Sequence, residues 1–175
     1  MQNAELDLLR EHFACLQDVI APLQLTLVED PRWEEPSSTA YLTDADRADP
    51  DTRGNFEAMQ ATNALIAWFG QDVEGFVGLW RGPDGIPLAT APVVRLDSEG
   101  QYALVAGNVG NYIAASRDED DFAEVRAVLV AAGLAVADEW EDIWDTTEGF
   151  ACPNDYRHVL YNEGRARRGL PPVEA

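Results

Sequence analysis

The chain has 175 residues with 32 acidic and 12 basic side chains, and its formal net charge is −20. All twelve basic residues are arginine, and 46% of the chain is apolar with five Trp, five Tyr and six Phe, which excludes a disordered protein. So negative a body repels phosphate, which argues against non-specific nucleic-acid binding. No apolar run reaches the roughly 18 residues of a membrane span, and the start at Met1 lacks the basic region of a signal peptide.

A chain of this length is expected to form one domain over 1–175, with a core large enough to fold without disulfides or metals. Its two cysteines, Cys15 and Cys152, are expected to be free thiols, because no secretion signal is recognised. A cytoplasmic location follows as an expectation.

The first third of the chain changes character at residue 29. Apolar residues spaced by three and four predict an amphipathic helix over 5–23, and alternation through Leu27 predicts a strand. The heptad-like spacing would also suit a partner helix, although burial in the domain's own core is the simpler interpretation. Residues 29–54, rich in Asp, Glu and Pro, predict a long acidic surface loop, followed by a short helix over 55–62.

The middle of the chain is typical of β-structure. Four apolar segments are separated by turn residues, and strands are expected at 66–70, 75–80, 92–96 and 101–105. The connections at 71–74, 82–85 and 97–100 are too short for crossover helices, so they indicate an antiparallel meander.

The last third is predicted to be helical. Asn108, Asp118 and Pro153 stand where helices would begin, Asp138 and Glu141 have the spacing of a capping box, and Gly133 and Gly169 follow helical patterns. The predicted fold class is therefore α+β: a single domain with a twisted antiparallel sheet of about four to six strands and N- and C-terminal helices packed around it.

No catalytic constellation is recognisable in the sequence. His12 and His158 lie in predicted helices without a motif, and no metal-binding spacing occurs. The glycine-containing stretch 107–110 opens a helix but lacks the lysine of a phosphate-binding loop, so a turn is expected there. We predict no catalytic residue, no metal ligand and no cofactor.

Acidic clustering is the strongest physical signal in the sequence. Between Asp118 and Glu148 there are eleven acidic residues and one basic residue, Arg126, which is half the net charge of the chain. Two interpretations have similar weight: a solvated surface with favourable helix-dipole contacts, or a docking surface for a basic partner. A divalent-metal site is weaker, because carboxylates adjacent on a helix point in different directions.

The candidate partner-binding residues come from three regions. They are Trp33 in the acidic loop, Asp72 and Glu74 in the first hairpin, and Asp118, Glu119, Asp120, Asp121, Asp138, Glu139, Glu141, Asp142 and Asp145. The five tryptophans are expected to be mostly buried, with Trp33 the most exposed. Arg165, Arg167 and Arg168 form a small basic cluster where a helix C-terminus favours cations.

The middle third resembles the SUKH superfamily of bacterial immunity proteins and fungal cell-wall synthesis regulators. The resemblance rests on three segments in the family's order: the glycine-centred hairpin at 66–80, the strand and turn at 91–100, and the strand-to-helix exit at 105–113. A departure from the family pattern is that its N-terminal Leu-Pro pair is reversed at Pro22-Leu23. The resemblance implies a non-enzymatic protein that neutralises a cognate toxin by stoichiometric binding.

Three functions follow as hypotheses. The first is a cytoplasmic immunity protein whose acidic surface binds a basic toxin domain, such as a nuclease, without contacting nucleic acid or membrane. The second is a scaffold or regulatory interaction domain of the same fold. The third and weakest is a metal-dependent hydrolase that uses the carboxylates.

Overall fold

The computed structural model describes residues 3–29 and 35–174, and this part of the chain is α+β as predicted. Its helices are α1 (Ala4–His12), α2 (Gln17–Ile20), α3 (Asp44–Ala48), α4 (Pro50–Asn63), α5 (Val109–Ala114), α6 (Glu119–Ala131), α7 (Asp142–Asp145) and α8 (Pro153–Arg167). Its strands are β1 (Thr26–Leu27), β2 (Ile66–Gln71), β3 (Gly75–Trp80), β4 (Val93–Asp97) and β5 (Tyr102–Ala106). Three short 3-10 helices lie at Ala21–Leu23, Glu35–Ser37 and Leu88–Thr90.

The five strands form one antiparallel sheet in the order β1-β2-β3-β4-β5, so each strand pairs with its neighbour in the sequence. This is the meander that the short turns predict. The β3–β4 pair runs in register from Gly75 opposite Asp97 to Leu79 opposite Val93. Each strand therefore presents alternate residues to opposite faces of the sheet.

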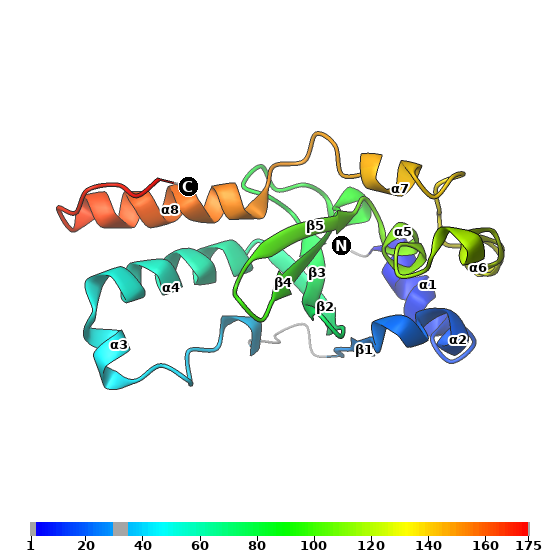
Figure 1. Cartoon of the computed structure of the whole chain (residues 1–175), viewed down its shortest axis with the longest axis horizontal. Helices are drawn as coiled ribbons and strands as arrows, with labels where there is room; N and C mark the ends of the chain where they lie inside the picture. Colours follow the sequence, from blue (N-terminus) through cyan, green and yellow to red (C-terminus); the bar gives the residue numbers. More distant parts are fainter. Residues whose placement is uncertain (1–2, 30–34, 175) are drawn as a thin grey trace.

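Helices cover both faces of the sheet (Figure 1). Val77, Leu79 and Val93 point to the face that α1, α5 and α6 cover, in a core that includes Leu9 and Leu129. The alternate residues of β3 and β4 point to the other face of the sheet. There Trp80, Val94 and Leu96 pack with Met59 of α4 and Tyr156 of α8. The sheet thus separates an α4–α8 end of the molecule from an α1–α5–α6 end.

Two side chains fix the start of α5 against its neighbours. Asn108 accepts a hydrogen bond from the Asn111 amide at 2.8 Å, which confirms the predicted cap. Glu5 of α1 accepts from the amides of Val109 (2.9 Å) and Ala135 (3.1 Å), so one carboxylate joins three segments. Gly110 lies close to the loop after α6: a Cβ there would be 2.1 Å from the Ala135 carbonyl oxygen.

Several local predictions are wrong. The helix expected over 5–23 breaks into α1, α2 and a 3-10 turn, and the following strand is reduced to Thr26–Leu27. The acidic loop expected over 29–54 contains α3 and the beginning of α4, because Thr43 and Asp49 cap them. The short helix expected from residue 55 is the continuation of α4 from Pro50 to Asn63.

The predicted caps of the acidic helices also differ from the structure. Asp118 is the residue before α6, but its side chain accepts no capping hydrogen bond. The capping box of Asp138 and Glu141 is wrong, because α7 begins only at Asp142 and Asp138 pairs with Arg126 instead. Both cysteines are free, as predicted. Within residues 3–29 and 35–174, none of the helices combines the length and the apolar character that crossing a bilayer would require.

Candidate functional site

The acidic segment folds into one end of the molecule. We call residues 118–131, which contain α6, together with residues 138–148 the acidic end; α6 and α7 lie near each other on the right of Figure 1. Trp140 joins its two parts, because its indole nitrogen donates to the Arg117 carbonyl, next to the start of α6, at 3.2 Å. Arg126 of α6 also donates to the carbonyl of Ala137 at 2.7 Å. Leu129 of α6 and Ile143 of α7 are both buried in the same hydrophobic core, which holds the two parts of the acidic end on the fold.

All eleven carboxylates of the acidic end are exposed to solvent. In the part of the chain that the structure describes, only Asp138 forms an ion pair, with Arg126. The ten others carry unneutralised charge: Asp118, Glu119, Asp120, Asp121, Glu124, Glu139, Glu141, Asp142, Asp145 and Glu148. The sequence-predicted acids of α6 and α7 are thus brought together at one end rather than scattered.

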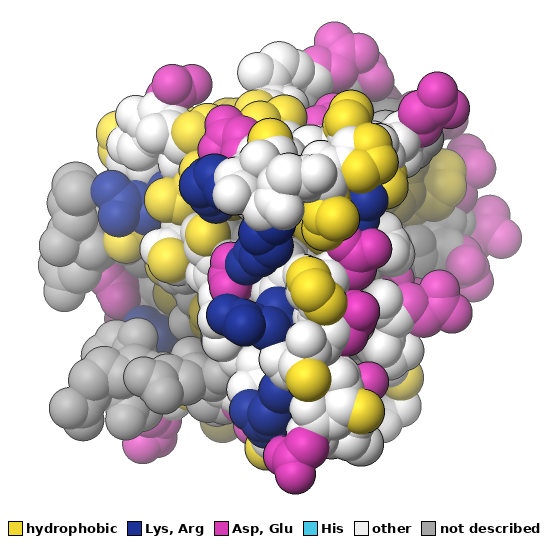
Figure 2. Space-filling view, turned by 90° about the vertical axis from the view of Figure 1, so that its left-hand side faces the viewer, with side chains coloured by type: hydrophobic (Ala, Val, Ile, Leu, Met, Phe, Trp, Pro, Cys, Tyr) yellow, Lys and Arg dark blue, Asp and Glu magenta, His cyan; other side chains and the backbone are white. Residues whose placement is uncertain are grey.

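At the opposite end, arginine side chains form ion pairs between α8 and α4. Arg165 of α8 contacts Asp51 of α4 at 2.6 Å, and Arg168 contacts Glu57 at 2.6 Å. Figure 2 shows arginine side chains following one another down this end, with acidic side chains beside them. Two members of the predicted basic cluster, Arg165 and Arg168, therefore attach α8 to α4, whereas Arg167 pairs with Glu163 of its own helix. The acidic end therefore holds a dense group of carboxylates without ion-pair partners among the described residues, whereas Arg165 and Arg168 neutralise carboxylates of α4 at the opposite end.

A buried ion pair lies under the turn between β2 and β3. The Asp72 side chain is fully buried, and its Oδ2 accepts from Arg95 Nη2 (2.7 Å), Arg95 Nε (2.9 Å) and the Tyr112 hydroxyl (2.8 Å). Its Oδ1 accepts from the amides of Glu74 and Gly75, both at 2.9 Å, which closes the turn. Burial, and then the neighbouring Asp72 charge, raise the pKa of Tyr112. This network fixes the hairpin on the rest of the fold.

A pocket with both apolar and polar walls opens beside this network. It has a volume of about 360 Å³, and its lining includes Leu23 and Val105. Two large apolar residues at its edge are exposed: Val73 at 60% and Trp144 at 47%. Glu74, 61% exposed at its side chain, pairs with Arg95 at the same pocket. We call it the Val73–Trp144 pocket.

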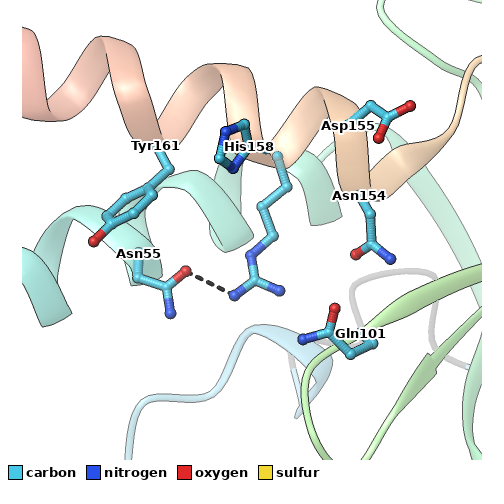
Figure 3. A pocket seen from close by; sticks show the side chains of 7 residues that line it. Asn55, Gln101, Asn154, Asp155, His158 and Tyr161 are labelled. Atoms are coloured by element: carbon cyan, nitrogen blue, oxygen red, sulfur yellow. Dashed lines mark hydrogen bonds between the residues drawn. The ribbon is translucent and has the colours of Figure 1, made fainter. Parts of the chain in front are cut away.

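A second pocket, of about 270 Å³, is polar and lies between α8, α4 and the sheet (Figure 3). Its hydrogen bonds attach α8 to its neighbours. Arg157 donates to Asn55 Oδ1 of α4 at 2.7 Å, and Asn154 pairs with both backbone groups of Tyr102, at 2.7 and 3.0 Å. The His158 ring is held by Asn162 at 2.9 Å. These hydrogen bonds hold α8 on the fold, and this structural role explains why the polar side chains lie in the pocket.

The predicted contact residues divide into three groups. Asp72 is wrong as a contact residue, because its side chain is buried and fully hydrogen-bonded. Glu74 and the nine predicted acids of residues 118–145 are exposed. Trp33 lies outside the described residues.

The exposed aromatic that sequence reasoning missed is Trp144. Its exposure differs from the expectation that the tryptophans other than Trp33 are mostly buried. Ile143 of the same short helix is fully buried, whereas Trp144 is 47% exposed and its ring packs edge-on with that of Trp140, with centroids 5.9 Å apart. A four-residue helix has too few turns for periodicity to separate its faces, and no other signal marked this residue.

Two searches bear on the chemistry of the chain. Among residues 3–29 and 35–174, no three His, Cys, Asp or Glu side chains come together as a metal ion would require. Comparison with protein-family models, with curated proteins and with solved structures gives no match in any of the three. The function is therefore inferred from the geometry and charge of the chain, together with the resemblance of its middle third described above.

Proposed function

We propose that this chain is a cytoplasmic, immunity-type protein that binds and neutralises a basic toxin domain through its acidic end. The observation that carries the proposal is the gathering at the acidic end of ten exposed carboxylates that have no ion-pair partner among the described residues. Like charges held this close repel one another and oppose folding, and a cationic partner relieves that repulsion. The type of partner comes from the SUKH resemblance.

The mechanism would be occlusion. A toxin domain that acts on nucleic acid carries a positively charged groove, and the acidic end would occupy that groove in place of phosphates. Opposite charges on the two surfaces raise the association rate and select the partner. No chemical step by this chain is involved.

Co-expression tests the proposal directly. The chain is produced together with the protein encoded by the neighbouring gene, and cell survival and co-purification are measured. We expect protection and a stoichiometric complex with one basic domain. Absence of both would refute the immunity function, and co-purification of several unrelated housekeeping proteins would favour a scaffold instead.

A further inference from the structure

The Val73–Trp144 pocket borders the acidic end, to which Trp144 belongs, and charge alone does not explain it. Its edge residues come from distant parts of the sequence, the β2–β3 turn and α7, yet both are large, apolar and exposed. Exposed apolar residues occurring singly are ordinary, whereas two that flank one hollow mark a contact surface.

The polar groups in this pocket are already partnered. Arg95 is engaged by Asp72 and Glu74, the Tyr112 hydroxyl donates to Asp72, and the Ser116 hydroxyl donates to the Ile113 carbonyl at 2.7 Å. A polar ligand would compete with these bonds, whereas an apolar group could lie against the apolar part of the lining, which includes Leu23, Val105 and Ala115, and leave them intact. This part of the pocket therefore favours an apolar side chain.

The pocket is also preorganised. The Val73 amide donates to the Leu23 carbonyl at 2.9 Å, and Asp72 closes the turn on either side of Val73. Trp144 is supported by the ring of Trp140. Binding of a partner would therefore order few further side chains in the pocket, so little conformational entropy would be lost there.

Charge around the pocket specifies the rest of the occupant. Asp142 and Asp145 lie on the same short helix as Trp144 and are unpaired in the described part of the chain, while Arg95 is outnumbered by Asp72 and Glu74. We propose that the pocket receives one apolar side chain, aromatic or aliphatic, from a basic segment of the partner protein. This inference rests on the proposed function and makes the pocket its central anchor, as buried aromatic contacts are in other interfaces.

The probes are two heptapeptides of equal positive charge, Arg-Lys-Gly-Phe-Gly-Lys-Arg and the same peptide with Ala in place of Phe. Binding is followed by NMR at the Trp144 indole and the Val73 methyl groups of the whole chain. We expect the Phe peptide to bind about tenfold more tightly, because one apolar side chain is buried, and to shift both signals. Val73→Ser and Trp144→Ala should each reduce this preference below about threefold.

Matched controls are exposed apolar residues outside the pocket. Val159→Ser and Tyr41→Ala remove side chains that are 52% and 68% exposed, and both should leave the preference unchanged. Equal binding of the two peptides, with signals shifting only on α6 and 138–148, would overturn the anchor and leave the acidic docking function standing. If neither peptide bound, the anchor would also be overturned, whereas the docking function would fail only if co-expression gave neither protection nor a complex.

Discussion

Asp72 and Glu74 show how two acids in one turn take different roles. Both contact Arg95, but the Asp72 side chain is fully buried and that of Glu74 is 61% exposed. Asp72→Asn should lower the free energy of unfolding by about 3 kcal/mol, since it leaves a largely buried guanidinium with a weakened partner. Glu74→Gln should change it by less than about 1 kcal/mol, because an exposed pair is screened by water. Urea denaturation of both variants measures the difference, and equal effects would contradict the assigned roles.

Two buried tyrosines should make the protein sensitive to alkali. Burial raises the pKa of Tyr102 and of Tyr112 above the ordinary value of 10.0. The native state then keeps protons that the unfolded state releases, so this stability is complete below the unfolded pKa and decreases as the pH rises above it. The chain has no lysine to titrate in the same range.

We expect each of these tyrosines to reduce the free energy of unfolding by about 1.4 kcal/mol per pH unit above about pH 10. Urea denaturation at a series of alkaline pH values measures the slope. Tyr102→Phe should lower stability at neutral pH, since its hydroxyl lies 2.6 Å from Asn63 Oδ1, but should also flatten the alkaline slope. An unchanged slope in this variant would show that Tyr102 does not titrate as described.

Among the elements, α5 depends on a close backbone approach. A Cβ on Gly110 would lie 2.1 Å from the Ala135 carbonyl oxygen. Both contacting groups belong to the backbone, so a side-chain rotation cannot relieve the clash. Gly110→Ala should therefore lower the free energy of unfolding by more than about 2 kcal/mol, although alanine is the better helix former. Gly149→Ala measures the destabilisation from a positive φ alone, because no atom lies within 4 Å of a Cβ there. Thermal denaturation of the two variants measures both effects, and a Gly110→Ala variant more stable than the original protein would contradict the close approach of Gly110 to Ala135.

Prediction from sequence succeeded where local chemistry decides the structure. Turn residues located the hairpins of the sheet, and Asn108, Gly133 and Pro153 correctly marked helix ends. It failed where tertiary contacts decide. The apolar spacing of 5–23 is continuous, yet the chain bends after His12, and Asp138 pairs with Arg126 rather than capping a helix.

The candidate site was predictable only in part. The density of acids in residues 118–148 identified the acidic end, because so many carboxylates cannot all be buried. The burial of Asp72 could not be inferred, since its partners Arg95 and Tyr112 lie 23 and 40 residues away. The sequence also could not show that Val73 and Trp144 line one pocket, because this pocket exists only after the hairpin and α7 have packed.

At the scale of the whole molecule, the concentration of unpaired carboxylates at the acidic end is the central feature. The arginines of α8 neutralise carboxylates of α4, whereas the acidic end keeps ten charges without partners among the described residues. If the acids served only hydration, their position on the surface would not matter for binding. If they form a docking surface, position should matter more than number.

Stopped-flow association with the basic domain of the co-expressed partner, at low and high salt, tests this claim most directly. The variant Glu119→Gln, Glu139→Gln, Glu141→Gln, Asp145→Asn neutralises four acids of the acidic end, and Glu11→Gln, Asp44→Asn, Asp84→Asn, Glu99→Gln neutralises four exposed acids elsewhere. We predict that the first variant associates about tenfold more slowly at low salt and loses most of its salt dependence, while the second changes less than about twofold. Equal slowing of the two variants would contradict the account, because it would show that net charge, and not the acidic end, attracts the partner.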